Sequence, residues 1–83
     1  MLTKFEAFRL VREQGEEKLR VNLIWFDPLE VMYFEQTDPV TSNESALIDC
    51  LIALRKDNEA WEVRCLFSQA EIDRLTKMLE ARR

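Results

Sequence analysis

The stretch from Leu19 to Gln36, LRVNLIWFDPLEVMYFEQ, constrains the fold most, because apolar residues flank a single strong turn signal on both sides. That signal is Asp27-Pro28, which favours a type I turn, since Pro presets φ and the Asp carboxylate bonds to the turn backbone. The sequence therefore predicts a β-hairpin. Side chains alternate along a strand, so one face, expected to be the core face, carries Leu19, Val21, Leu23, Trp25, Met32 and Phe34. The other face carries Ile24, Phe26, Val31 and Tyr33.

The same turn signal has a second interpretation. Asp27 fits an N-cap, Pro28 a first helical residue and Glu30 the third position of a capping box, which together would start a short helix. The strand formers Val-Met-Tyr-Phe that follow, and the next stop at 37–39, leave little room for one. We therefore favour the strand.

The N-terminal segment fits two structures. Thr3 and Glu6 match a capping box and Gly15 suits a helix C-terminus, which predicts a helix over about 4–14. Its apolar residues are spread around the helical wheel, however, so no single stripe would face a core. A strand over 5–12, turning at 14–17 into the next strand, also fits. We favour the helix; a strand would give the sheet five strands rather than four.

The segment 46–67 predicts a second hairpin, because apolar residues alternate on both sides of the polar loop at 55–59, RKDNE, in which Asp and Asn tolerate left-handed backbone. A helix over 45–56 is the alternative. In the hairpin, residues whose numbers sum to 115 face each other: Leu54 with Trp61, Ile52 with Val63, and Cys50 with Cys65. The two cysteines are expected to be buried free thiols in a reducing cytoplasm.

The C-terminal segment predicts a helix from Gln69 to about Ala81. Ser68 and Glu71 form a capping box, and Phe67 with Ile72 forms a hydrophobic staple. An apolar stripe for packing on the sheet consists of Ile72, Leu75, Met78 and Leu79.

The sequence thus predicts a single compact α+β domain over 1–83: a small antiparallel sheet of about four strands, a C-terminal helix packed on it, and an N-terminal helix. A polar connection, 37–45, joins the two hairpins. It contains a match to a glycosylation acceptor at 43–45, which we treat as chance.

The charge of the chain is −4 and is unevenly distributed. No Lys or Arg occurs between Val21 and Leu54, where the acidic residues are Asp27, Glu30, Glu35, Asp38, Glu44 and Asp49. This distribution disfavours direct binding to nucleic acid, which needs a cationic surface. No apolar run is long enough to span a membrane, and the N-terminus lacks the pattern of a secretory signal, so we expect a cytoplasmic protein.

Residues suited to catalysis are few. The chain has no His and a single Gly, which removes the commonest general base and all glycine-rich phosphate-binding loops. The carboxylate pairs Asp27 with Glu30 and Glu35 with Asp38 are best explained as solvated turn ends. Two Cys without a CxxC spacing do not complete a zinc site. We therefore expect no enzyme, no cofactor and no metal.

The remaining expectation is recognition of another protein. An aromatic patch with an acidic rim resembles a protein interface in its composition. The predicted partner-binding residues are Ile24, Phe26, Glu30, Val31, Tyr33 and Glu35. The sequence therefore predicts a small non-enzymatic adaptor, regulator or inhibitor, whose partner would have a basic surface.

Four alternatives stay open. The N-terminal segment could cover this face as a second core layer, or the face could pair with a second copy as a homodimer. The chain could be an acidic mimic of nucleic acid that occupies a basic groove of its partner. An enzyme that uses carboxylates alone is the last. Small acidic domains of this kind also occur among inhibitors from phages and mobile elements, an association that rests on size and charge.

Overall fold

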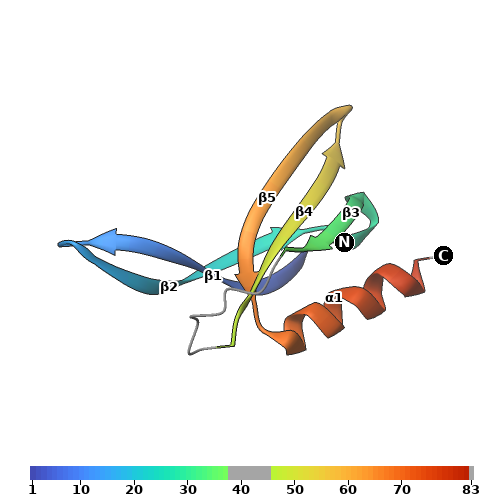
Figure 1. Cartoon of the computed structure of the whole chain (residues 1–83). Coiled ribbons are helices and arrows are strands. Elements are labelled where there is room, and N and C mark those ends of the chain that lie inside the picture. The colour runs from blue at the N-terminus through green and yellow to red at the C-terminus, as the bar shows by residue number, and fades with distance from the viewer. Residues whose placement is uncertain (38–45, 83) are drawn as a thin grey trace.

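The computed structural model describes residues 1–37 and 46–82 and has an α+β architecture (Figure 1). Five strands form one antiparallel sheet in the order β2-β1-β5-β4-β3, with one helix after the last strand. The strands are β1 Thr3–Glu13, β2 Glu16–Phe26, β3 Val31–Gln36, β4 Ile48–Lys56 and β5 Glu59–Phe67. A 3-10 turn, η1, covers Pro28–Glu30, and the helix α1 covers Gln69–Ala81. The predicted connection over 37–45 lies almost entirely outside the described residues.

Two hairpins with the same kind of turn make up most of the sheet. Gln14 and Gly15 have φ of 52° and 80°, and Asp57 and Asn58 have φ of 52° and 66°. Positive φ at both central residues marks a type I′ turn, whose twist matches that of the flanking strands. In the β4–β5 hairpin the register pairs Leu54 with Trp61, Ile52 with Val63 and Cys50 with Cys65, as predicted.

The predicted N-terminal helix is wrong, and the sheet has five strands rather than about four. Residues Thr3–Glu13 form β1, which pairs along its whole length with β2. The reason is visible in the burial: Phe5 and Ala7 are fully buried while Lys4 and Glu6 are exposed, an alternation with the period of a strand.

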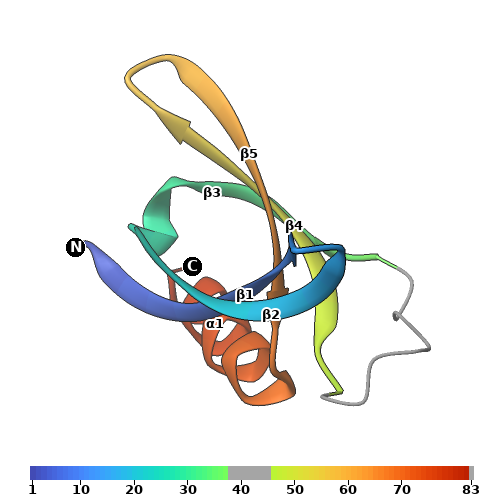
Figure 2. The same cartoon turned by 90° about the vertical axis from the view of Figure 1, so that its left-hand side faces the viewer.

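The predicted hairpin around Asp27-Pro28 is also wrong. In the described part of the chain β2 pairs with β1 and β3 pairs with β4, so the two strands form opposite edges of the sheet. The Asp27 carboxylate accepts a hydrogen bond from the Leu29 N–H at 3.0 Å, as an N-cap does. One 3-10 turn therefore carries the chain across the open end of a strongly curved sheet, which is visible as an incomplete ring in Figure 2.

The predicted faces of β2 and of the start of β3 are reversed as a consequence. Phe26 and Val31 lie in the core with 6% and 4% of their surface exposed. Five residues expected in the core are exposed instead: Leu19, Val21, Leu23, Trp25 and Met32. Phe34 packs against the core as predicted, beyond a register shift between Val31 and Tyr33. Because β2 takes its register from β1, its even-numbered residues follow Phe5 and Ala7 into the core.

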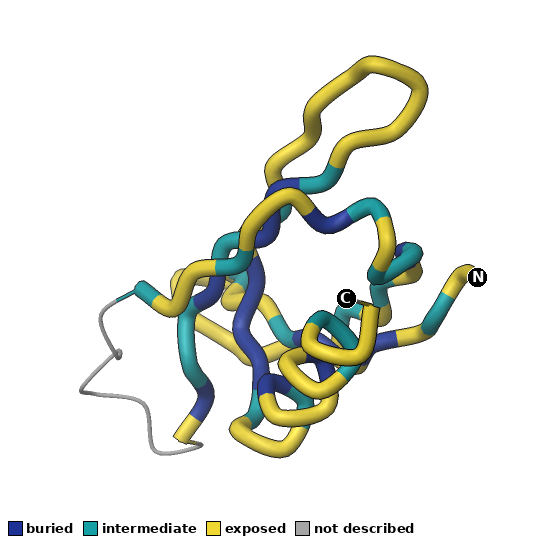
Figure 3. The backbone as a smooth tube through the Cα atoms, turned by 90° about the vertical axis from the view of Figure 1, so that its right-hand side faces the viewer, coloured by how far each residue is buried: buried dark blue, intermediate teal, exposed yellow. Residues whose placement is uncertain are grey.

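The helix α1 begins and ends as predicted. The Ser68 hydroxyl accepts a hydrogen bond from the Glu71 N–H at 3.2 Å, and Ile72 and Leu75 are buried against the sheet. The core cluster draws on all five strands and on the helix: Phe5, Ala7, Phe26, Val31, Cys50, Ile52, Cys65, Phe67, Ile72 and Leu75. The tube in Figure 3 shows this core where the strands cross, above the helix.

Both hairpins project away from that crossing. The strands β1 and β5 pair only at Phe8 and Leu66 and then diverge. The radius of gyration is 13.5 Å, and the molecule measures 43 × 24 × 20 Å. A compact domain of this length would have a radius of gyration of about 12 Å. The hairpin arms therefore expose more surface than the small core requires.

Candidate functional site

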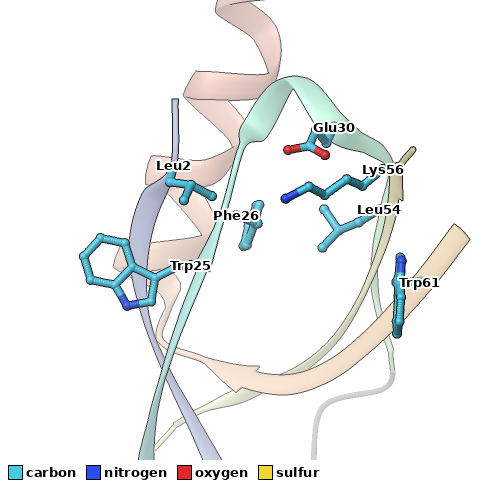
Figure 4. Close-up of a pocket in the computed structure, with 7 residues that line it drawn as sticks. All are labelled: Leu2, Trp25, Phe26, Glu30, Leu54, Lys56 and Trp61. Atoms are coloured by element: carbon cyan, nitrogen blue, oxygen red, sulfur yellow. The ribbon is translucent and has the colours of Figure 1, made fainter. Parts of the chain in front are cut away.

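Both tryptophans of the chain line one small pocket at the open end of the curved sheet (Figure 4). Trp25 and Trp61 are 61% and 57% exposed and stand on opposite sides of it. The pocket has a volume of about 120 Å³ and is lined by Leu2, Trp25, Phe26, Glu30, Leu54, Lys56 and Trp61. These residues come from the N-terminus, β2, η1 and the β4–β5 hairpin.

Strand register positions one wall of this pocket. Trp61 and Leu54 are directly opposite each other in the β4–β5 hairpin. They lie on the same face as Ile52, which is fully buried two residues earlier. Because the hairpin projects beyond the core at this point, the core-facing side chains of Leu54 and Trp61 remain accessible.

The other wall is the end of β2. The Phe26 ring stacks on Phe5, with centroids 4.4 Å apart and an angle of 13° between the planes. This stacking fixes the position of Phe26 at the inner end of the pocket. The adjacent Trp25 points to the opposite side of the strand, where the Lys4 ammonium lies 6.0 Å from the centre of its ring.

Two side chains of opposite charge complete the pocket. The Lys56 side chain extends over the apolar lining, and the Glu30 carboxylate lies beside its end (Figure 4). Among the ion pairs of residues 1–37 and 46–82, none within 4.0 Å joins these two groups. Each can therefore interact with a ligand that carries charges or hydrogen-bonding groups.

The six predicted partner-binding residues do not share one surface. Phe26 and Glu30 line the pocket, whereas Val31 is buried and Ile24 packs against the core. Tyr33 is on the outer face of β3, where its hydroxyl donates a hydrogen bond to the Glu62 carboxylate at 3.0 Å. That bond raises the pKa of the Tyr33 hydroxyl. Glu35 lies on the same outer face, two residues further along.

Sequence reasoning missed five pocket residues: Leu2, Trp25, Leu54, Lys56 and Trp61. A signal for part of this set was present, because the correct β4–β5 register already placed Trp61 opposite Leu54. What was missing was the position of β2 relative to that hairpin. Only the curvature of the sheet brings the end of β2, with Trp25 and Phe26, close to Leu54 and Trp61 of the β4–β5 hairpin.

Of the acidic residues of the segment 21–54 that the structure describes, only Glu30 lines this pocket. The Asp27 carboxylate accepts a hydrogen bond from the N-terminal ammonium at 2.8 Å, which lowers its pKa. Asp49 contacts the Thr37 hydroxyl at 2.7 Å and forms an ion pair with Arg64 at 3.2 Å. Asp38 and Glu44 lie outside the described residues.

The two cysteines are buried and unpaired by a disulfide. Burial raises the pKa of Cys50 to about 11 and that of Cys65 to about 12, so both remain protonated at neutral pH. A protonated thiol is a poor nucleophile. Within residues 1–37 and 46–82, no group of three or more Cys, Asp or Glu side chains is arranged to hold a metal ion.

No helix in the described part of the chain is long and apolar enough to cross a membrane. Comparison with protein-family models, with curated proteins and with solved structures finds no match to this chain.

Proposed function

We propose that this protein is a small non-enzymatic interaction module that binds another protein through the pocket between Trp25 and Trp61. One observation carries the proposal: both tryptophans of the chain line the same pocket, and each keeps more than half of its surface exposed. Tryptophan is among the residues that dominate binding energy at protein interfaces. Covering the Trp61 indole and the part of Trp25 that borders the pocket would supply much of the energy for a specific complex.

The size and chemistry of the pocket define what the partner would insert. A cavity of about 150 Å³ holds one benzene molecule, so a pocket of about 120 Å³ suits a single apolar side chain such as Leu or Met. Lys56 and Glu30 would then contact polar groups next to that side chain, such as a carboxylate and an ammonium or a backbone N–H. The proposed ligand is a protein segment with one apolar anchor and charged neighbours.

The pocket is favoured over the nucleic-acid mimic by the state of the carboxylates. Asp27 and Asp49, two of the four described acidic residues of the segment 21–54, are engaged by groups of the chain itself. A mimic needs free carboxylates on one surface. We place the protein in the cytoplasm, since two buried thiols facing each other across strands suit a reducing compartment.

Selection of peptides from a random displayed library tests the proposal. The protein should enrich peptides with one apolar anchor, and their binding should alter the fluorescence of the two tryptophans. Trp61→Ala should weaken binding by at least about tenfold, as truncation of an interface hot spot does. The matched control is Met32→Ala, since Met32 is an exposed apolar residue outside the pocket.

Two results would count against the pocket. The first is a set of selected peptides that bind Trp61→Ala as tightly as the wild type. The second is peptide binding with no change in tryptophan fluorescence. Circular dichroism of Trp61→Ala should match the wild type, because this side chain is largely exposed and contributes little to the core.

A further inference from the structure

The outer face of the β1–β2 hairpin carries five of the exposed large apolar residues of the described chain and meets the pocket only at Trp25. The register pairs Leu10 with Leu19 and Phe8 with Val21 on this face, while Phe5 and Ala7 face the core. Five of its apolar residues are between 37% and 61% exposed: Leu10, Leu19, Val21, Leu23 and Trp25. We propose that this face packs against the same face of a second copy of the chain and forms a symmetric dimer.

The area of the face matches what a stable dimer needs. The five exposed residues present roughly 500 Å² of surface, if about 200 Å² is taken for a whole large apolar side chain. Two copies would together bury about 1,000 Å², the lower bound for a specific protein interface. A patch of this size lies within the upper half of the range for single proteins, where such patches are often functional.

The charged residues on the outer face favour a second copy as the occupant. Lys4 and Glu6 lie at one end, and Arg12 and Glu17 lie at the other. Arg12 and Glu17 are exposed, and no ion pair of the described residues within 4.0 Å includes either. Each is therefore available to a group on a partner.

One two-fold arrangement satisfies these charges. With the axis parallel to the strands, β1 lies over the partner's β2, and Arg12 faces the partner's Glu17 while Lys4 faces the partner's Trp25. Glu6, the remaining charge, faces the partner's Leu23 and turns its carboxylate toward solvent. With the axis across the strands, Arg12 would instead face the partner's Lys4, and like charges would repel.

The other basic residues of the hairpin are held away from this interface. Arg20 donates two hydrogen bonds to the Glu13 carboxylate, at 3.0 and 2.7 Å, on the opposite face. Lys18 lies 3.9 Å from the same carboxylate. The outer face thus has apolar residues at its centre and charges only at its ends, which is the usual layout of an interface.

Light scattering on a sizing column tests the dimer first. At about 100 µM the wild type should have twice the chain mass of 9.9 kDa. Val21→Lys places a charge at the centre of the face and should give a monomer with unchanged circular dichroism. Ala60→Lys, on an exposed position of the other hairpin, should remain a dimer. A monomeric wild type, or a Val21→Lys variant that is still dimeric, would overturn the proposal.

A mixing experiment tests the arrangement. Arg12→Glu and Glu17→Arg should each weaken the dimer by at least about tenfold, because each places like charges across the two-fold axis. An equal mixture of the two variants should form a heterodimer, because the acidic copy then faces the basic copy. If the mixture stays monomeric, or if each variant alone dimerises as the wild type does, the aligned arrangement is wrong.

The dimer and the peptide pocket share Trp25, but variants at Trp61 and Val21 separate them. Trp61→Ala should lose peptide binding and remain a dimer, whereas Val21→Lys should lose the dimer and still bind the selected peptides. Loss of the dimer in Trp61→Ala would contradict the assignment of the dimer to the hairpin face. Loss of peptide binding in Val21→Lys, with the fold intact, would show that the two surfaces are one site.

Discussion

Helix α1 is expected to hold β1 in place through side chains that bond to the strand backbone. On the N-terminal side of Phe8, the edge of β1 is not paired with β5. There the Glu71 carboxylate accepts a hydrogen bond from the Glu6 N–H at 2.7 Å, and the Arg74 guanidinium donates to the Lys4 carbonyl at 2.9 Å. Glu71→Ala removes the first of these bonds.

The expected loss of stability has two main sources, since the ion pair of Glu71 with Arg74 at 3.2 Å is partly exposed and adds little. A hydrogen bond to a charged group contributes about 1.5–3 kcal/mol, and the low end applies because water can reach this exposed N–H. A carboxylate in the first turn of a helix adds about 0.3–1 kcal/mol through the helix dipole. We therefore expect Glu71→Ala to lower the free energy of unfolding by about 2 kcal/mol. In a domain of this size that corresponds to a fall in Tm of roughly 10 °C.

Urea denaturation of three variants separates the sources. Glu71→Gln keeps an acceptor for the Glu6 N–H and should lose about 1 kcal/mol, the part that depends on charge. Asp73 lies on the same helix, and its carboxylate accepts a hydrogen bond from the Gln69 side chain of that helix. The free energy of unfolding of Asp73→Ala should therefore stay within about 0.5 kcal/mol of the wild type. If Glu71→Ala is no more destabilising than Asp73→Ala, the helix does not hold β1 in this way.

Two further predictions concern the core. Phe26→Ala should lower the free energy of unfolding by about 3–5 kcal/mol, because Phe26 is buried and stacked on Phe5. Tyr33→Ala, on the exposed face, should lower it by less than about 1 kcal/mol. Equal losses of the two variants in urea denaturation would contradict these positions. Because the folded state raises the pKa of Cys50 and Cys65, the unfolded chain releases these protons first, so stability should fall as pH rises from about 9 toward 11. The fall should be smaller in Cys65→Ala, and the native thiols should resist alkylation by iodoacetamide at pH 8.

The features that sequence predicted correctly are those set by neighbouring residues. The polar loop at 55–59 fixes the β4–β5 register, because two residues tolerant of positive φ lie at its centre. The Ser68 cap and the stripe that includes Ile72 and Leu75 fix helix α1. In both cases the signals lie within a few residues of the structure that they determine.

The features that sequence missed depend on contacts between distant residues. Asp27-Pro28 is a strong turn signal, but it does not specify whether the strands on either side pair with each other. In the structure β2 pairs with β1 instead of β3. The type I′ turn at Gln14-Gly15 that joins β1 to β2 is shorter than the connection through Asp27-Pro28, and its twist matches that of the strands. Once β1 and β2 paired, a shift of one residue in parity reversed the faces of β2 and moved Phe26 into the core.

The candidate site was predictable only in part for the same reason. Phe26 and Glu30 were identified as binding residues, and the pairing of Leu54 with Trp61 was correct. The sequence did not predict that these two pairs lie in the same pocket. Hydrophobic patterns report which face of one strand is buried. They do not report the curvature that brings the end of β2 to the β4–β5 hairpin, since that curvature depends on the whole sheet.

The small core and the two long projecting hairpins explain why the proposed binding surfaces include residues of the hairpins. Two type I′ hairpins set their own registers locally, so the domain needs tertiary contacts only where they cross, at Phe8 and Leu66, and where α1 covers the core. Residues beyond the crossing add little to that core. Apolar residues there would lower solubility without adding stability, yet Leu10 and Leu19 on one arm and Trp61 on the other are exposed beyond the crossing. The proposed recognition of a peptide at one arm and of a second copy at the other would account for that placement.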